Sequence, residues 1–403
     1  MLGLSEFVSC VTEMSYYFPQ EILEEILHRL PHKSLVNCIS VCKSWKSLIS
    51  DHSFICDHLK RTIQTNPDIA SLFLFISLKK RVEGYKYCES QDFYSLYSDN
   101  HQSDDPSVLK SSLIPLFTSE HKEVVGTCNG LVCLADYSVL DCSDLIIWNP
   151  CIQKYVVLPK PSVTFRSCDP DHKRNRVFFG FGFDSKTKDF KVVRLVATIH
   201  NREETPQVEI YSLATGSWRN ITGRAPPILL CMQVLWKHQV FINGVIHWVV
   251  SQRRNGRIHN FILTFDVVDE TFGELMLPQP LRESPYQLSI LAGEDSLAVV
   301  HTYCSESDEE FVSIWVMKEY GAVDSWAEVF HSNSTCYGGI SSVLAIRNSG
   351  ELVLRIYGGK MILLDPVKEL VKDLGPRDLV HAFAGYHVKS LFLINEEQGD
   401  LCY

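Results

Sequence analysis

Residues 145–159 read LIIWNPCIQKYVVLP, which is an apolar run, a short polar turn and a second apolar run. Runs rich in β-branched and aromatic residues on either side of turn residues are typical of β-hairpins. Four further stretches have the same form: VEIYSLATGSWRNI (208–221), ILTFDVVDETFGELMLP (262–278), VSIWVMKEYGAVDSWAEV (312–329) and MILLDPVKELVKDL (361–374). Aligned on Trp148, Tyr211, Phe265, Trp315 and Leu364, the five copies lie 63, 54, 50 and 49 residues apart.

A second aromatic follows the first after seven residues in three copies, as Tyr155, Trp218 and Phe272. In the fourth copy it is Trp326, eleven residues later, which predicts a longer turn, and the fifth copy lacks both aromatics. The repeats therefore share a hairpin form more than they share identities.

Each copy is preceded by another strand–turn–strand pattern: GTCNGLVCLAD (126–136), FFGFGFDSKTKDFKVVRLV (178–196), VFINGVIHWVV (240–250), LAGEDSLAVVH (291–301) and LAIRNSGELVLRI (344–356). One repeat is thus four short strands in roughly 50 residues, a period near that of kelch repeats. Such a unit cannot bury both of its faces alone, and radial stacking around an axis solves this. A β-sandwich or two tandem barrels is the rival architecture.

Strand-like segments also remain outside the five repeats: SLFLFISL (71–78) and FYSLYS (93–98) before them, AFAGYHVKSLFLI (382–394) after them. Because propellers often close by pairing their first and last strands, we predict one more blade built from both ends. The expected fold is mainly β: a propeller of about six blades, give or take one or two, preceded by a small all-α module.

That module is residues 18–54, FPQEILEEILHRLPHKSLVNCISVCKSWKSLISDHSF, where glycine is absent and apolar residues recur at helical spacing. Pro31 cannot continue the first helix, so the chain must turn near Leu30. Two further short helices are expected over 34–39 and 41–49. Three short helices bury little core, so the module either caps the next domain or docks on a partner; periodicity alone favours neither.

The residues of this module resemble the F-box, whose motif typically begins Leu-Pro and continues through Leu-Pro-x-Lys-Ser-Leu and Val-Cys-Lys-x-Trp. The first motif position holds Phe18, a larger apolar residue than the usual Leu. The resemblance implies docking on a Skp-type adaptor, and through it on a cullin and a RING subunit. If the matching motif positions have the same role here, the residues in or just behind the adaptor surface are Phe18, Pro19, Ile22, Ile26, Leu30, Pro31, Leu35, Val41, Cys42 and Trp45. Trp45 is expected to belong partly to the core of the module.

The later region resembles the F-box-associated interaction domain of plants, a kelch-like, substrate-binding family. The resemblance rests on GTCNGLVCLAD, IIWNP with a later LP, GFGFDSKTKDFKVVRL, INGVIHW and ILTFDV, which occur in the family's order. It covers most of residues 120–375. The expected division is a flexible extension (1–15), the F-box (16–58), a linker (59–70) and the propeller (71–395), with Met1 or Met14 as the start.

Composition narrows the functional class. Of 403 residues, 45% are hydrophobic and 21% charged, which is typical of globular proteins. The net charge of −10 argues against a nucleic-acid partner. The sequence has no apolar run of the length that a membrane-spanning helix needs, so no such helix is predicted. The 14 cysteines are scattered without a Cys-x-x-Cys pair, which favours free thiols over a zinc or redox site. We therefore expect location in the cytoplasm, the nucleus or both.

Catalytic motifs are missing from the sequence. Gly180-Phe-Gly182 lacks the third glycine of a dinucleotide fingerprint, and His247 has the setting of a satisfied sheet residue. Asp184, Asp266 and Asp365 end strands, where Asp bonds local backbone. No catalytic residue, metal or cofactor is expected.

The predicted function is that of the substrate receptor of a Skp–cullin–F-box ubiquitin ligase, which promotes ubiquitination and degradation of its target. The alternatives are a propeller-fold enzyme and an adaptor-bound protein acting outside ubiquitin ligation. Target-binding residues cannot be named. Variable loops on a rigid scaffold are the candidates: 97–112, 166–176, 200–206, 252–259 and 304–310.

Overall fold

The structure is a computed structural model. It describes residues 19–65, 71–81, 88–98, 122–136, 144–163, 175–198, 207–225, 232–234, 239–254, 256–293, 296–347, 349–374 and 379–395. The predicted extension 1–15, with Met1 and Met14, lies outside the described residues, as does Phe18. So do the candidate loop 200–206 and most of 97–112 and 166–176.

The described part of the amino-terminal module, from residue 19 on, has four helices: α2 (Gln20–His28), α3 (His32–Cys38), α4 (Lys43–Ile49) and α5 (His52–Thr65). Pro19 and Pro31 stand immediately before α2 and α3, where a missing backbone N–H costs nothing. Asp51 caps α5, since its Oδ1 accepts the backbone N–H groups of Ser53 at 2.8 Å and Phe54 at 3.2 Å. Helix α5 runs through residues 58 and 59, where the sequence predicted the linker to begin.

The strands form six antiparallel sheets in the described residues, and every sheet but one follows the chain order. The first three sheets in sequence are β3 (Lys122–Cys128), β4 (Leu131–Asp136), β5 (Leu145–Asn149), β6 (Lys154–Val157); β7 (Asn175–Asp184), β8 (Asp189–Thr198), β9 (Gln207–Ser212), β10 (Ser217–Asn220); and β11 (Met232–Val234), β12 (Val240–Ile242), β13 (Val245–Arg254), β14 (Arg257–Asp266), β15 (Thr271–Leu275). Both β11 and β12 pair with β13, so the innermost strand of the third sheet is interrupted.

The next two sheets are β16 (Gln287–Ala292), β17 (Leu297–Cys304), β18 (Glu310–Met317), β19 (Trp326–Asn333); and β20 (Ile340–Ile346), β21 (Leu352–Ile356), β22 (Lys360–Asp365), β23 (Leu370–Asp373). Short helical turns link strands at η2 (Thr222–Arg224), α6 (Gln279–Arg282), η4 (Val323–Ser325) and η5 (Cys336–Gly338). Both halves of each predicted repeat lie in one sheet, which confirms the four-strand unit.

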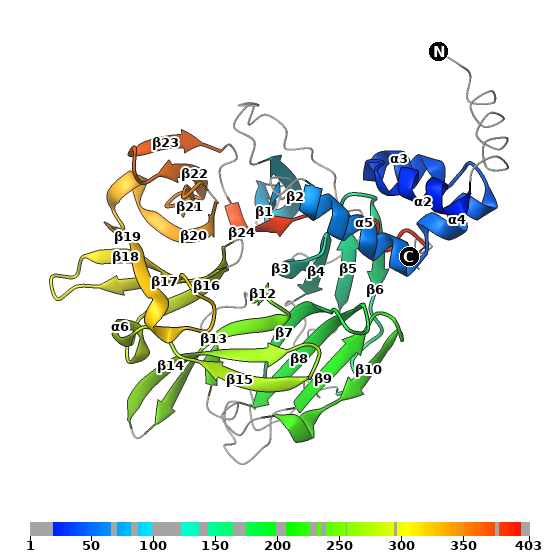
Figure 1. The fold of residues 1–403 in the computed structure, drawn as a ribbon. Coiled ribbons are helices and arrows are strands. Elements are labelled where there is room, and N and C mark those ends of the chain that lie inside the picture. Colours follow the sequence, from blue (N-terminus) through cyan, green and yellow to red (C-terminus); the bar gives the residue numbers. More distant parts are fainter. Residues whose placement is uncertain are drawn as a thin grey trace.

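The sixth sheet joins the two ends of the β region. Strand β1 (Ser71–Arg81) pairs with β2 (Cys88–Ser98) on one side and with β24 (Leu379–His387) on the other. The inner strands then contact one another in the order β3, β7, β12 with β13, β16, β20, β24 and back to β3. The sheets therefore close a ring, seen along its axis in Figure 1. The predicted propeller of about six blades is confirmed, as is the blade built from both ends.

Burial falls from the middle of each blade toward its outer edge. All residues of β4 and β5 are buried, because neighbouring blades cover both faces of these strands. The outermost strands are largely exposed, and β23 is exposed at all four positions. The apolar runs quoted from the sequence follow from this coverage of both faces in the middle strands.

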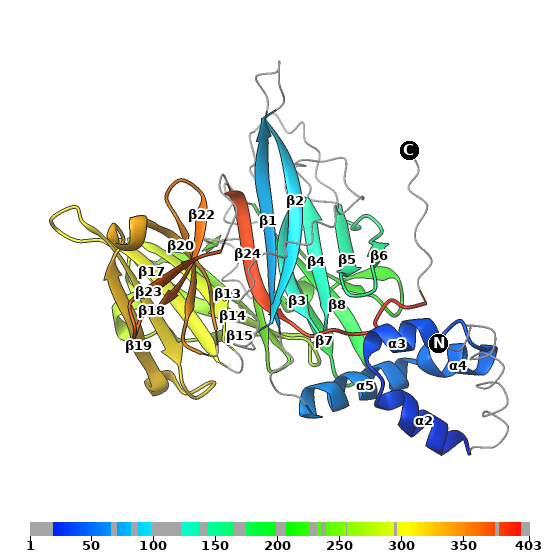
Figure 2. The same cartoon turned by 90° about the horizontal axis from the view of Figure 1, so that it is seen from above.

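The chain after β24 corrects one expectation. Residues 390–394, predicted as part of a strand, leave the sheet and pass between the blades and the helices. Leu391, Phe392 and Leu393 are buried there in a hydrophobic cluster shared with the helical module and the first two blades. Figure 2 shows this segment running beside α3 and α5. The tail thus joins the helices to the propeller.

Candidate functional site

Helix α2 presents an apolar stripe to solvent. Ile22 and Ile26 are one helical turn apart, and 46% and 47% of their surfaces are exposed. Pro19, just before the helix, is exposed as well. Leu27 points the other way and is fully buried in the module core. Because large aliphatic side chains gain free energy on burial, this stripe is suited to docking on another surface.

The remaining predicted adaptor residues divide by burial. Pro31 is exposed, whereas Leu30, Val41 and Cys42 are half-buried and pack against the core. Leu35 and Trp45 are buried, with exposed fractions of 0% and 8%. They can support a docking surface only from behind, which agrees with the expected core role of Trp45.

Two exposed apolar residues of the module were absent from the predicted set, Val36 on α3 and Ile63 on α5, the latter 43% exposed. Val36 on α3 has 37% of its surface exposed. It directly follows the buried Leu35, so its side chain takes a different direction on the same short helix. Helical periodicity in residues 32–38 could have placed Val36 on the exposed side of the helix. The set carried over from the F-box motif did not include this position.

Ion pairs and stacked rings hold α2 against α5. The Glu25 carboxylate accepts Arg61 at 2.7 Å and Arg29 at 2.9 Å, and these bonds hold the pKa of Glu25 below its usual range. The His28 ring stacks on Phe54 with 4.1 Å between centroids. These contacts fix the direction in which the α2 stripe faces.

The module is also fixed to the propeller. The Phe392 ring lies 4.7 Å from Phe190 of β8 and 5.7 Å from His52 of α5, centroid to centroid. Asn149 Nδ2, at the end of β5, donates to the Phe392 carbonyl at 2.9 Å. Asn395 Nδ2 donates to the Ser50 carbonyl at 2.9 Å. A surface docked on α2 would therefore hold a defined orientation relative to the blades.

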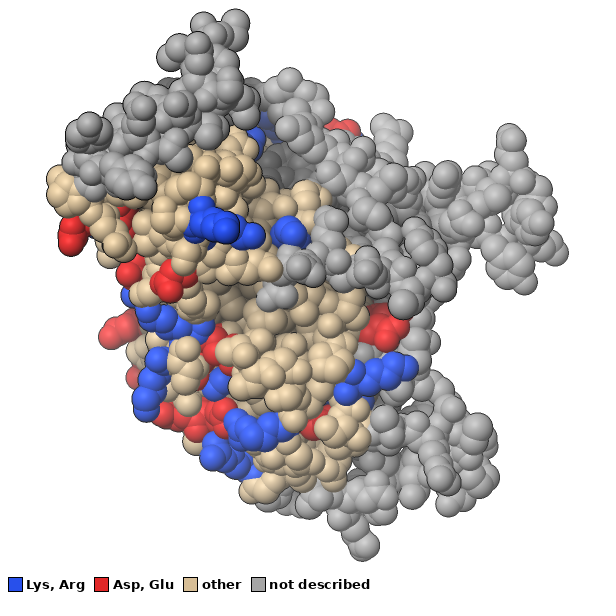
Figure 3. All heavy atoms as spheres, turned by 90° about the vertical axis from the view of Figure 1, so that its right-hand side faces the viewer, with Lys and Arg blue, Asp and Glu red and all other residues tan. Residues whose placement is uncertain are grey.

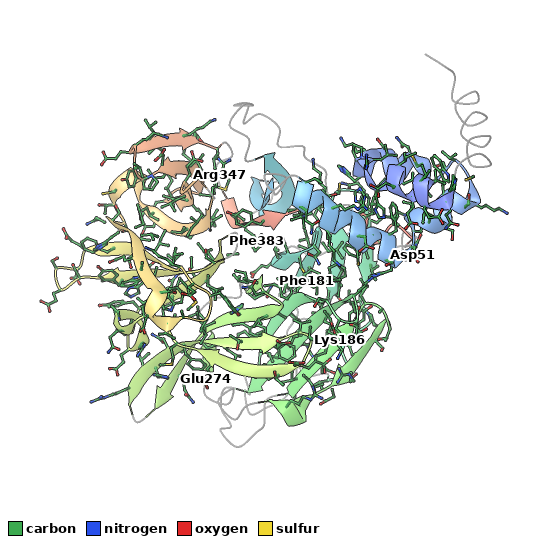
Figure 4. The ribbon with its side chains drawn as sticks, in the orientation of Figure 1. Asp51, Phe181, Lys186, Glu274, Arg347 and Phe383 are labelled. Carbon is green, nitrogen blue, oxygen red and sulfur yellow. The ribbon has the colours of Figure 1, made fainter. Side chains whose placement is uncertain are left out.

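Charges of both signs are interspersed on the described part of the face in Figure 3, which looks at the helical side of the molecule. No large patch of one sign is visible on that part of the face. Figure 4 shows Asp51 at the start of α5, and Lys186 lies in the β7–β8 turn. In the same turn, Lys188 Nζ donates to Ser53 Oγ at 3.2 Å.

Blade β16–β19 carries a cluster of aromatic rings beside the candidate loop 304–310. Neighbouring ring centroids lie 4.7 Å apart for His301 and Tyr303, 5.6 Å for Tyr303 and Phe311, and 5.5 Å for Phe311 and His331. Tyr286 adjoins the cluster and is 39% exposed. Partly exposed aromatic side chains are enriched in protein–protein contacts.

The residues weighed for chemistry have structural roles. Asp184, Asp266 and Asp365 each accept two backbone N–H groups of the following turn through Oδ1, at 2.8 to 3.0 Å. His247 is fully buried: its Nδ1–H donates to the Val240 carbonyl at 3.3 Å and its Nε2 accepts the Tyr320 hydroxyl at 2.9 Å. Burial lowers the pKa of His247 to about 4.

Within the described ranges, no three His, Cys, Asp or Glu side chains are grouped as a metal ion would need. The eight cysteines whose side chains are described are free thiols. None of the described helices has the length and apolar character needed to cross a membrane.

Comparisons with known proteins match both parts of the chain. Residues 86–355 match the family of the F-box associated beta propeller domain, and residues 17–57 match the F-box domain. The chain is 27% identical to F-box protein CPR1 of Arabidopsis thaliana over 95% of its own length and 90% of that protein. It is 28% identical to the F-box/kelch-repeat protein At3g23880 of the same plant, over 77% and 78% of the two chains.

Among solved structures, an exo-β-1,3-galactanase from Phanerochaete chrysosporium aligns with a TM-score of 0.36 and 7% identity, over 65% of this chain and 62% of that one. Both family models agree with the motifs quoted from the sequence and with the architecture of helices followed by blades. The chain is a plant F-box protein, and it belongs to the family of the F-box associated beta propeller domain.

Proposed function

We propose that this F-box protein is the substrate-recognition subunit of a Skp–cullin–F-box ubiquitin ligase. An F-box domain indicates binding to a Skp-type adaptor. The proposal adds that the adaptor brings a cullin and a RING subunit, and that the propeller binds a target protein for ubiquitination and degradation. The chain performs no bond chemistry itself. It acts by holding target lysines near the ubiquitin-charged enzyme, which raises their effective concentration.

The observation that supports this proposal most is the exposed stripe of Ile22 and Ile26 on a module that is fixed to the blades. A receptor must hold two partners in a set geometry, and Phe392 with its neighbours provides the connection. The aromatic cluster of blade β16–β19 supports a protein contact on the propeller side. The proposal includes no nucleic-acid partner and no membrane.

Titration of the purified chain with a purified Skp-type adaptor tests the docking half. We expect Ile22→Asp combined with Ile26→Asp to weaken binding at least about 100-fold, because central apolar anchors dominate interface energy and a buried carboxylate would lack a partner. Both residues are exposed in the free chain, so the variant should keep its circular dichroism spectrum and melting temperature.

The control is Val367→Asp, which makes the same kind of apolar-to-Asp change once, at an 89% exposed valine in the turn between β22 and β23. It should bind the adaptor as the wild type does. Absence of wild-type binding would contradict the proposal, and unchanged binding by the double variant would show that the adaptor uses another surface.

The two alternatives make different predictions. A propeller-fold enzyme would keep its activity in the Ile22→Asp, Ile26→Asp variant. An adaptor-bound protein outside ligation would bind the adaptor without promoting ubiquitin transfer. We also propose location in the cytoplasm, the nucleus or both, which the free thiols support. Imaging of a fluorescent fusion tests this, and secretion of the fusion would contradict it.

A further inference from the structure

A cavity of about 480 Å³ lies at the axis of the propeller. Its walls come from the inner strands of several blades, including Phe241 of β12, Ile290 of β16, Leu344 of β20 and Phe383 of β24. Figure 4 shows Phe383 near the centre of the ring. Ile63 of α5 also lines the cavity, so the helix that ends the F-box module reaches this site. The volume lies in the range of small-molecule sites, roughly 300–1,000 Å³.

The cavity has a charge preference. Among the described residues that line it, Arg355 of β21 is the one Lys or Arg, and none is Asp or Glu. Burial lowers the pKa of Arg355, which shows that its guanidinium has lost part of its hydration. A partly desolvated cation in an apolar wall attracts an anion more strongly than one in water does.

The wall also offers a hydrogen-bond acceptor. Gln239 precedes β12 and is 96% buried, with Nε2 donating to the Phe181 carbonyl at 3.3 Å. Its Oε1 has no hydrogen-bond partner in the described part of the chain. A Cβ at residue 126 would collide with this side chain, so glycine at 126 gives Gln239 its place. A buried acceptor without a partner costs free energy that a donor on a ligand would recover.

We propose that the axial cavity binds a small organic anion, with an apolar ring body against Phe241, Ile290 and Phe383 and an acidic group facing Arg355. Apolar walls with a few polar groups that fix orientation are the usual form of such sites. Because Ile63 belongs to the wall, the cavity that holds the molecule is bounded by both the propeller and helix α5. Its binding stabilises the folded state by mass action, independently of the adaptor.

The test uses 6-hydroxy-2-naphthoate as the probe, whose hydroxyl can donate to Gln239 Oε1, and 6-hydroxy-2-naphthamide, the same ring body and hydroxyl without the charge, as its comparison. Calorimetric titration of the full chain should show saturable binding of one naphthoate, with a dissociation constant on the order of 100 µM for a ligand of this size. The melting temperature should rise with probe concentration. The amide should bind at least about tenfold more weakly.

Variants locate the binding. Arg355→Gln should weaken naphthoate binding at least about tenfold and leave the amide nearly unaffected. The control Arg347→Gln removes a cation at the end of the neighbouring strand β20, one that pairs with Glu351 at 3.0 Å and does not line the cavity. It should leave binding unchanged.

Two further variants fill the space from different blades, Ala384→Phe on β24 and Ser289→Phe on β16. Either one, if it keeps its melting transition and adaptor binding, should abolish probe binding. If one of these variants does not fold, the other still tests whether the probe binds in the cavity. No saturable naphthoate binding by the folded wild type would overturn the proposal, as would binding that survives the filled cavity. Equal binding of acid and amide would overturn the charge preference.

Discussion

Single residues explain why the repeats could be recognised although their identities differ. In three blades the two aligned aromatics are direct cross-strand partners: Trp148 with Tyr155, Tyr211 with Trp218, and Phe265 with Phe272. Side chains directly opposite each other on neighbouring strands stabilise a sheet by contact. The constant spacing of seven residues therefore reflects the same hairpin register in these three blades. In the fourth blade the register shifts after Ile314, and Trp326 lies opposite Met317 instead. The spacing of eleven follows from the longer turn alone, because the register shift lies on the other side of Trp315 from that turn.

The turn of the β9–β10 hairpin offers a residue-scale prediction. Gly216 has φ +63°, and a Cβ there would meet nothing within 4 Å. Gly216→Ala should therefore lower the free energy of unfolding by about 1 kcal/mol through backbone strain alone. The control Gly223→Ala also has open space but no positive φ, and should change stability little. Equal effects in urea denaturation would contradict this reading.

Buried histidines predict a loss of stability in acid. The pKa of His247 is about 4 in the folded state, against 6.5 ordinarily, so between these values the unfolded state binds the extra proton. Stability is full above pH 6.5 and falls as the pH drops toward 4. His247 alone lowers the free energy of unfolding by about 2 kcal/mol between pH 7 and pH 5.

The measurement is the free energy of unfolding at pH 7 and pH 5 for wild type, His247→Gln and the control His331→Gln at an exposed position. His247→Gln should have the smaller difference between the two pH values. His301 and His387, whose pKa values burial lowers to about 4 and about 3, keep part of the acid effect in that variant. If the difference in the free energy of unfolding between pH 7 and pH 5 were the same in His247→Gln as in the wild type, His247 would not be a source of the acid effect.

At the scale of elements, hairpins were predictable from the sequence, and their burial was not. The run LVCLA of β4, which Asp136 follows, is apolar because blades cover both faces of the strand, and this covering is visible only in the assembled ring. Helical periodicity likewise predicted the short helices of the module, and the F-box motif supplied the docking residues. The motif placed Trp45 partly in the core, but it did not separate the exposed Ile22 and Ile26 from the buried Leu35, because α5 and the tail, which complete the core, lie at or beyond the end of the motif.

The tail segment gives a prediction at this scale. Phe392 is 3% exposed and contacts rings from α5, β7 and β8. Phe392→Ala should cost about 3 kcal/mol, as for other buried aromatics, and should speed hydrogen exchange in α5 more than in β20–β23. Val157→Ala, at a residue that is 53% exposed on β6, is the control. Uniform faster exchange throughout the chain would contradict a local connection.

The whole molecule is a ring whose two ends meet in one sheet, so β1 and β24 are partners separated by most of the chain. Closure protects sheet edges and leaves the F-box module seated on the first two blades. That geometry is what a receptor requires: one surface for an adaptor at the side, and blade loops for a target. The repeat count and the unpaired end segments made the closure predictable before any contact was known.

If the proposed function holds, adaptor docking on α2 brings this chain into an active ubiquitin ligase. The direct measurement is ubiquitin transfer in a reconstituted mixture of adaptor, cullin, RING subunit and ubiquitin-charged enzyme, followed on lysines of the chain and its bound proteins. The wild type and Val367→Asp should be conjugated at the same rate, and Ile22→Asp with Ile26→Asp at least about tenfold more slowly. Adaptor binding by the wild type without any transfer would contradict the claim.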